Sequence, residues 1–183
     1  MTTEKHTLRQ TVMAKLLHQT VDERMALEAQ IMVNLDKLIE ELAVKSIAFY
    51  HPVHHELDVT PLAEHLVDKG IKILLPRVTE KESPLVFNLW YPGDDLEEDV
   101  CHIPCSHGEE AMPEVVVCPC IAYDPKGLRL GYGEGYFDRT FEKYPDIIRV
   151  GIAQSLQKVD AIPQEKHDIP MHYWVTETDT LKV

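Results

Sequence analysis

Hydrophobic residues recur at helical spacing over the first part of the chain, residues 3–44. The apolar positions form two stripes with intervals of three or four residues, which is typical of amphipathic helices. Val21-Asp22 lies between the stripes, so we predict two helices that meet there. Lys5 and Arg9 stand four residues apart and share one face of the first helix. Such a pair forms either a solvated basic face or a site for an anion that relieves the repulsion.

Short apolar runs rich in β-branched residues predict strands farther along the chain. Pro76 closes the second of these runs, and together they occupy residues 46–50, 71–75, 85–90, 115–123, 147–153 and 172–176. Thr60 and Pro61 mark the start of a helix that ends at Gly70. A second short helix is predicted at residues 136–144, directly before a proline.

The order strand, helix, strand over residues 46–75 is typical of a βαβ unit, whose strands are parallel. We therefore predict the α/β fold class, with a mostly parallel sheet flanked by helices in a single three-layer domain that covers residues 1–183. Ligands of such sheets bind beyond the carboxyl ends of the strands. His51, Glu56 and Asp58 follow the first predicted strand, so each is a candidate site residue as well as an ordinary surface polar residue.

The composition narrows the possible classes of function. The chain has 183 residues, 44% of them hydrophobic, which suffices for one domain with a full core. A net charge of −13 argues against a nucleic-acid partner and requires that local cations meet any anionic substrate. Every apolar run is shorter than the roughly 20 residues that a membrane span needs. Residues 1–6 lack the apolar core of a signal peptide, so we expect a cytoplasmic protein without membrane or nucleic-acid partners.

A glycine-rich segment, residues 127–139, links the strand predicted at 115–123 to the helix predicted at 136–144. This order puts backbone N–H groups and a helix N-terminus where they can hold an anion. Alternate glycines permit positive φ angles and let a ligand lie against the main chain, and they stand here at Gly131, Gly133 and Gly135. The spacing is neither the dinucleotide fingerprint nor a P-loop, and a tight turn that needs glycine for shape alone would look the same.

Charged side chains in the same segment favour phosphate binding over a simple turn. Arg129 and Arg139 flank the glycines, and a guanidinium group is well shaped to bind phosphate through two hydrogen bonds. Asp138 offers oxygen ligands to a hard cation such as Mg²⁺.

Four cysteines leave a second kind of site open. Residues 91–113 are acidic, rich in Pro, Gly and His and without periodicity, which indicates a surface connection. A zinc site would combine residues of this segment with residues of the strand at 115–123, namely Cys101, Cys105, His107, Cys118 and Cys120. The spacing matches no standard zinc knuckle, and Cys118 and Cys120 point the same way along a strand, toward either the core or a ligand.

Five segments, taken in order, make the chain resemble a known family. They are K-x-x-L-R at residues 5–9, E-x-D at 56–58, P-C-I-A-Y-D at 119–124, the glycine segment at 127–139 and Q-x-V-x-x-x-P-x-E-x-H-D at 157–168. These segments are similar to the motifs of the 5-formyltetrahydrofolate cyclo-ligases, also called methenyltetrahydrofolate synthetases. The resemblance covers nearly the whole chain, and the glycine segment and the last segment are its specific parts.

The resemblance implies an ATP- and Mg²⁺-dependent ligase that converts 5-formyltetrahydrofolate to 5,10-methenyltetrahydrofolate with release of ADP and phosphate. Its partners would be small molecules, ATP and a reduced folate. ATP would phosphorylate the formyl oxygen, which is otherwise a poor leaving group, and N10 of the folate would then attack. Phosphoryl transfer of this kind depends on positioning and charge neutralisation, so no residue is implied as a covalent catalyst.

By the same resemblance, three groups of residues form the site. His51, Glu56 and Tyr136 are implied for the folate, and Asp138 and Asp168 for Mg²⁺. The residues implied for ATP are Lys5, Arg9, Arg129, Leu130, Gly131, Tyr132, Gly133, Glu134, Gly135, Tyr136 and Phe137.

The chain departs from the family pattern at several positions, among them Glu134, Cys120 and Val59. Glu134 stands where the family has glycine or lysine, and its carboxylate would repel phosphate unless it faces solvent or pairs with a cation. Cys120 replaces a glycine at the expected floor of the pocket. The alternative hypotheses are therefore a diverged non-catalytic nucleotide- or folate-binding paralogue on the same fold, and a zinc-binding interaction module.

Overall fold

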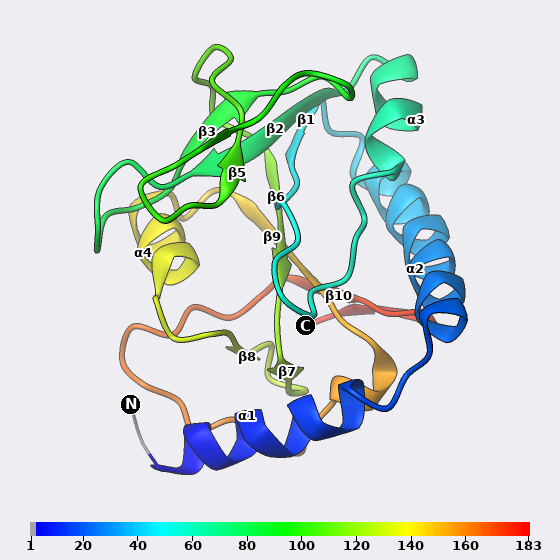
Figure 1. Ribbon diagram of the computed structural model, residues 1–183, viewed down its shortest axis with the longest axis vertical. Helices are drawn as coiled ribbons and strands as arrows, with labels where there is room; N and C mark the ends of the chain where they lie inside the picture. Colours follow the sequence, from blue (N-terminus) through cyan, green and yellow to red (C-terminus); the bar gives the residue numbers. More distant parts are fainter. Residues whose placement is uncertain (1–2) are drawn as a thin grey trace.

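The computed structural model describes residues 3–183 and contains a central seven-stranded sheet between helices (Figure 1). Met1 and Thr2, part of the segment examined for a signal peptide, lie outside the described residues. The helices are α1 (Thr3–Leu16), α2 (Val21–Leu42), α3 (Leu62–Asp68), α4 (Tyr136–Lys143) and the short 3-10 helix η1 (Ser155–Gln157). The central strands are β1 (Ser46–Ala48), β2 (Lys72–Arg77), β3 (Val86–Leu89), β6 (Val115–Pro119), β9 (Ile148–Ile152), β10 (Tyr173–Val175) and β11 (Thr180–Lys182). Two further pairs form separate hairpins, β4 (Glu97–Glu98) with β5 (Pro104–Cys105) and β7 (Ala122–Tyr123) with β8 (Arg129–Leu130).

The central sheet is mostly parallel, as predicted. Its strand order is β11-β10-β9-β6-β1-β2-β3, and the two outer strands β3 and β11 are antiparallel to their neighbours. Strand β1 pairs in parallel with β2 on one side and with β6 on the other. The chain therefore leaves β1 in one direction and later returns on its opposite side, which creates a switch point between β1 and β6.

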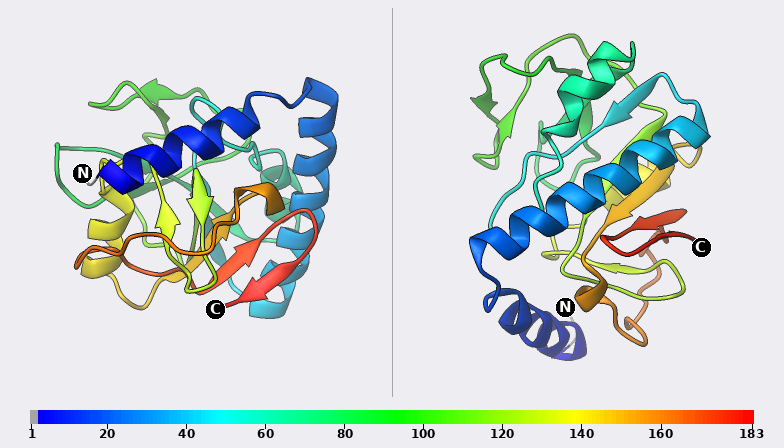
Figure 2. Two further views of the ribbon diagram at one scale, coloured as in Figure 1. Left: turned by 90° about the horizontal axis from the view of Figure 1, so that it is seen from below. Right: turned by 90° about the vertical axis from the view of Figure 1, so that its right-hand side faces the viewer.

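Alternate residues of the strands face two separate cores, which gives the predicted three layers. Ile47 and Val117 belong to the core that α2 and α3 cover. Ala48 and Cys118 belong to the opposite core, where Phe141 of α4 packs. Figure 2 shows α2 and α3 lying along one face of the sheet, as this division requires. The period of two along a strand is the physical reason that one sheet can serve both cores.

Helix α1 packs on a third, smaller core beneath the β7–β8 hairpin (Figure 1). Val12 of α1 meets Ile121 and Leu130 there. The break between α1 and α2 lies at residues 17–20, so the prediction that Val21-Asp22 separates the helices was wrong. Thr20 caps α2, because its side chain accepts a hydrogen bond from the Glu23 amide and the Glu23 carboxylate accepts one from the Thr20 amide.

Two predicted strand ends differ from the structure. The apolar run at 115–123 divides after Pro119, because Ile121 and Ala122 turn away to pair with Leu130 in the β7–β8 hairpin. Strand β2 continues through Pro76, which faces Phe87 of β3. Pairing of β2 with β1 ends at Leu74, so the missing N–H of the proline falls where β2 has only one neighbour.

Other differences from the predicted elements are smaller. Residues 91–113 form a connection at the surface, but they contain the β4–β5 hairpin, which the missing periodicity did not indicate. Strand β11 was not predicted either. The indole ring of Trp174 in β10 lies against Gly151 of β9, where an added Cβ would come within 2.0 Å of a ring carbon. Among the described residues, no helix combines the length and the apolar character that crossing a bilayer requires.

Candidate active site

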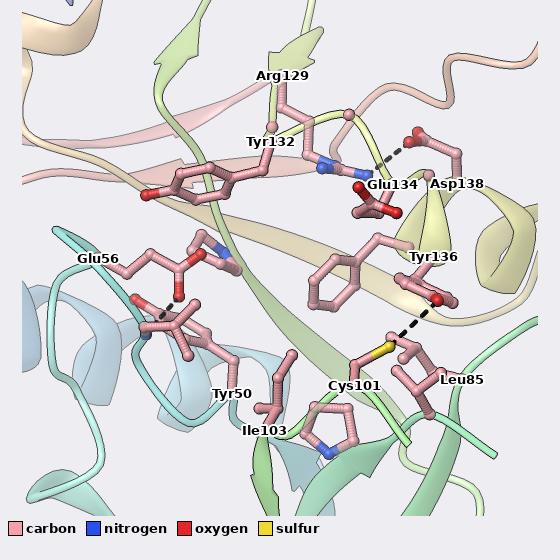
Figure 3. Close-up of a pocket in the computed structure, with 18 of the residues that line it drawn as sticks. Tyr50, Glu56, Leu85, Cys101, Ile103, Arg129, Tyr132, Glu134, Tyr136 and Asp138 are labelled. Carbon is pink, nitrogen blue, oxygen red and sulfur yellow. Dashed lines mark hydrogen bonds and ion pairs between the residues drawn. The ribbon is translucent and has the colours of Figure 1, made fainter. Parts of the chain in front are cut away.

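A cavity of about 950 Å³ opens at the carboxyl ends of the central strands (Figure 3). Tyr50 and His51, which follow β1, form part of its wall, together with Pro119 at the end of β6 and Val78 after β2. The cavity therefore lies at the switch point between β1 and β6, where open parallel sheets bind their ligands. His51 and Glu56 both line it, as the prediction from strand ends required, whereas Asp58 does not.

The glycine segment forms one wall of this cavity, and Leu130 to Phe137 all contribute to it. Gly133 and Gly135 have φ angles of 109° and 71°, which a side chain would strain. Gly135 is the N-cap of α4 and supplies no side-chain acceptor for the first amides of that helix. No side-chain cap bonds to these amides within the described residues, and an anion is a ligand that suits such a helix start.

Two arginines in the wall carry buried nitrogens that have no partner. Nε of Arg9 donates to the carbonyl of Gly131 at 2.7 Å, and Nη2 of Arg129 donates to Asp138 at 2.7 Å. Nη1 of Arg9 and Nε of Arg129 are buried without a hydrogen-bond partner among the described residues. Buried polar atoms in native proteins are nearly always paired, so two unpaired guanidinium nitrogens at one cavity point to an anionic ligand.

Lys5 is not part of a solvated basic face, the commoner of the two sequence interpretations. Only 5% of Lys5 is exposed, and its Nζ lies 2.7 Å from Asp168 and 3.1 Å from Glu165. Burial alone would lower the pKa of Lys5, but the hydrogen bonds to Asp168 and Glu165 outweigh burial and raise it. The anions that stabilise this cation are carboxylates of the same chain, brought from the other end of the sequence.

A backbone hydrogen bond links the two residues predicted for Mg²⁺, but Asp138 does not belong to the group of potential metal ligands that contains Asp168. Oδ1 of Asp138 accepts a hydrogen bond from the amide of Ile169, the residue after Asp168. The ligand atoms of Glu165, His167 and Asp168 all lie within 4.8 Å of one another. This oxygen-rich set fits a hard divalent cation, because such ions prefer carboxylate ligands. Glu165 and His167 were not predicted as site residues, although both stand in the last of the five motif segments.

Glu56 lies at the opposite end of the cavity from Asp138 (Figure 3). Burial raises the pKa of its carboxyl to about 7, against the opposing effect of the Val53 amide, which donates to Oε2 at 2.9 Å. The ring of Tyr132, from the glycine segment, lies 5.3 Å from the ring of His54. A carboxyl that titrates near neutrality in a cleft is typical of a functional site.

The connection between β4 and β5 closes a further side of the cavity. Asp99, Cys101, His102 and Ile103 line it, and of these the sequence analysis named only Cys101, as a candidate zinc ligand. The Asp99 carboxylate accepts hydrogen bonds from the amides of Val78, Cys101 and Ile103, and this holds the turn on the end of β2. Sγ of Cys101 lies 3.4 Å from the hydroxyl of Tyr136 (Figure 3).

The cysteines do not gather into a metal site. Cys118 and Cys120 both point into the core around α4, and burial raises the pKa of Cys118 to about 12. Within residues 3–183, the potential metal ligands that cluster include no cysteine. The zinc hypothesis therefore has no support from the arrangement of the described side chains. Cys120 does not form the floor of the cavity, because its thiol points to the carbonyl of Ile152 at 3.7 Å.

Glu134 and Arg139, two charged residues of the glycine segment, differ in whether they face the cavity. Glu134 is exposed and lines the cavity, and its carboxylate takes part in no ion pair within the described part of the chain. Arg139 does not line the cavity, since its guanidinium donates to the Glu134 carbonyl at 2.8 Å and lies over the ring of Tyr136. Of the two flanking arginines, only Arg129 therefore faces the site.

Comparison with known proteins identifies the family of this chain. The sequence profile of the 5-formyltetrahydrofolate cyclo-ligase family matches residues 1–177. The chain belongs to this family. It is similar to the 5-formyltetrahydrofolate cyclo-ligase of Escherichia coli K12, with 31% identity over 140 residues that cover 72% of this chain and 77% of the relative. It is also similar to the enzyme of that name from Haemophilus influenzae, with 29% identity over 143 residues, 73% of this chain and 76% of the relative.

Solved structures agree with this family. The 5,10-methenyltetrahydrofolate synthetase of Aquifex aeolicus has a TM-score of 0.84 and 30% identity, over 97% of this chain and 92% of that one. A synthetase of the same kind from Mycoplasma pneumoniae has a TM-score of 0.76 at 21% identity, over 94% of this chain and 98% of that one, and supports the fold alone. The expectations of this family, of the α/β fold class and of an enzyme of the ligase class are confirmed.

Proposed function

We propose that the chain converts 5-formyltetrahydrofolate to 5,10-methenyltetrahydrofolate, with ATP and Mg²⁺, by phosphorylation of the formyl oxygen and release of ADP and phosphate. One observation carries this proposal: a single ligand could span the cavity and contact both of its ends. Arg9 and Arg129 bring two buried, unpaired nitrogens to one end, and Glu56, whose pKa is about 7, lies at the other. A ligand that fills such a cavity has an anionic part and a part with hydrogen-bonding groups. ATP together with a reduced folate meets this description.

The phosphates of ATP would lie against the glycine segment. The alternate glycines leave the main chain bare from Gly131 to Gly135, and the start of α4 supplies amide donors. Arg9 and Arg129 each hold a buried nitrogen that a phosphate oxygen would satisfy. Lys5 would join them once its carboxylate partners turned toward a cation.

Asp138 and Asp168 would hold the Mg²⁺ ion, with Glu165 close enough to help. When bound, the ion supplies charge neutralisation at the phosphates and a fixed geometry for them. The present partners of these carboxylates are Arg129 and Lys5, so two ion pairs would exchange when metal and nucleotide bind together. Cations would then move to phosphate and carboxylates to the metal, so each of these charged groups would keep a partner of opposite charge.

The folate would occupy the end formed by His51, Glu56 and Tyr136. There its formyl oxygen would attack the γ-phosphorus of ATP, with ADP as leaving group. N10 would next attack the formyl carbon and lose its proton. The carbon–oxygen bond would then break, and phosphate would leave with the electron pair. The protein would orient the reactants and exclude water, which is the main contribution of a protein to phosphoryl transfer.

The direct test is to incubate the purified chain with 5-formyltetrahydrofolate, Mg²⁺ and ATP and to follow the near-ultraviolet absorbance of the methenyl product. We expect product only when ATP and Mg²⁺ are both present. Absence of product from a folded protein that binds ATP would overturn the proposal.

A second candidate is a non-catalytic binding protein on the same fold. The observation in its favour is Glu134, an unpaired carboxylate in the wall where the phosphates would lie. This candidate predicts that ATP and the folate bind without turnover. It also predicts that a neutral or basic residue at position 134 restores the reaction.

A further inference from the structure

The loop that carries Glu56 has no regular structure of its own. Residues 49–61, between β1 and α3, form neither helix nor strand, so the sheet does not fix their direction. Several hydrogen bonds act within the loop. Among them, the Tyr50 hydroxyl donates to the carbonyl of Leu57 at 2.5 Å, and the amide of Glu56 donates to the carbonyl of Val53 at 3.1 Å. Leu57 and Val59 are also buried in the main core, which attaches this part of the loop to the fold.

Helix α2 adds an attachment directly after Glu56. Nη2 of Arg24 donates to the carbonyl of Glu56, and Oε1 of Glu28 accepts from the amide of Asp58 at 2.9 Å. The same Oε1 accepts from Nε of Arg24 at 2.9 Å, so the two side chains form one unit along a single helix face. Their contacts reach the peptide groups directly before and after Leu57.

The support under this pair is rigid. Helix α2 has 22 residues, a capping box at Thr20 and a stripe of buried side chains, among them Ile31 and Leu35 in the main core. Glu28 is itself largely enclosed, with 14% of its side chain exposed. A pair held this firmly can fix the backbone beside Glu56, in addition to the burial of Leu57 and Val59 in the main core.

We propose that Arg24 and Glu28 are positioning residues that hold Glu56 in the folate end of the cavity. Neither side chain lines the cavity, so both act through the backbone of the loop rather than on a ligand. The inference rests on the proposed function for its kinetic consequence, because Glu56 matters to turnover only if the folate binds beside it.

The variants that test this inference separate charge from position. In Glu28→Ala both hydrogen bonds to Oε1 are lost, together with the charge. In Glu28→Gln the charge is lost, but an amide oxygen remains to accept from Asp58 and Arg24. Asp36→Ala is the matched control, because Asp36 is an acidic residue of the same helix whose partners Lys69 and His65 lie on α3.

In Glu28→Ala we expect the KM for 5-formyltetrahydrofolate to rise about tenfold, which corresponds to the loss of one or two hydrogen bonds at a charged group. The KM for ATP should stay within about twofold, because the phosphate end of the cavity is untouched. Glu28→Gln and Asp36→Ala should resemble the wild type. Equal effects on both KM values, or equal effects of Ala and Gln at position 28, would overturn the inference.

A second measurement does not depend on turnover. A ¹³C NMR titration, with the Glu56 signal assigned by its loss in Glu56→Gln, reports the pKa of Glu56 directly. We expect about 7 in the wild type and a clearly lower pKa in Glu28→Ala, because the released loop lets water reach the carboxyl. Glu28→Gln controls for the lost charge and should remain near the wild type. The titrating and charged groups around Glu56 are Tyr50, Tyr132, Cys120, Asp58, Arg24 and Glu28, and only the last is changed.

The two measurements together distinguish the two ideas. If the wild type shows no turnover but the titration of Glu56 still depends on the residue at position 28, the proposed function fails and the positioning role stands. If turnover occurs but Glu56 titrates at the same pH in the wild type, Glu28→Ala, Glu28→Gln and Asp36→Ala, the positioning role fails. A folded Glu28→Ala protein with an unchanged Glu56 titration therefore refutes the inference in either case.

Discussion

Glu56 makes the stability of this protein depend on pH in a way that can be calculated. Its carboxyl has an ordinary pKa of 4.5, which burial raises to about 7 in the folded chain. A group with a raised folded pKa contributes stability that is fully present below the unfolded value. That contribution is lost as the pH rises through the folded value. The free energy of unfolding should thus fall between pH 4.5 and about 7 because of this one group.

The substitution Glu56→Gln removes this dependence and retains the shape. A pKa unit corresponds to about 1.4 kcal/mol, so the difference between 4.5 and about 7 sets an upper limit of about 3.5 kcal/mol. We expect about 2 kcal/mol, because the carboxyl is not completely buried and water reduces the cost of its charge. The glutamine oxygen can still accept from the Val53 amide, so the loop keeps that hydrogen bond.

Urea denaturation of both proteins at about pH 5 and about pH 8 measures the effect, since these values lie on the two sides of the titration. The difference in unfolding free energy between Glu56→Gln and the wild type should shift in favour of the variant by about 2 kcal/mol from the lower to the higher pH. Glu23→Gln is a control without this dependence, because hydrogen bonds from Thr20 lower the pKa of Glu23 from its ordinary value of 4.5, so its titration lies below both pH values. The reasoning is refuted if the stability difference between Glu56→Gln and the wild type does not change with pH.

Three further substitutions test the site and the fold. Asp138→Asn should lower Mg²⁺-dependent turnover by about 100-fold or more with little change in the unfolding midpoint, and full activity would contradict a metal role. Glu134→Lys should lower the KM for ATP about fivefold by removing a repulsion of about 1 kcal/mol, whereas Glu142→Lys on the outer face of α4 controls for net charge. Gly151→Ala should reduce the free energy of unfolding by about 3 kcal/mol in urea, because the new methyl group overlaps the Trp174 ring, and an unchanged midpoint would refute that contact.

Local patterns in the sequence determined much of the fold. Helical periodicity identified α1 and α2, and apolar runs identified the strands of the central sheet apart from β11. These features depend on neighbours in the chain, which is why they can be predicted. The errors occurred where distant segments intervene. Pro76 remains within β2 because β1 ends beside it, and the run at 115–123 divides because Leu130 pairs with its last residues.

The motif segments likewise indicated the family and the wall of the cavity before any contact was known. The glycine segment, His51 and Glu56 all line the cavity, because the carboxyl ends of parallel strands meet at one edge of the sheet. This rule needs only the order of helices and strands along the chain, so it can be applied to a sequence alone. The roles of the individual side chains in binding stay predictions.

Only the tertiary structure decided the electrostatics of the site. Lys5 pairs with Asp168, and Arg129 pairs with Asp138, so predicted phosphate and metal ligands neutralise each other in the chain alone. The turn at Asp99 and the support of Glu56 by α2 also have no local signature. The reason is physical. Ion pairs, burial and pKa depend on which groups lie within a few ångströms, and the folded chain alone sets those distances.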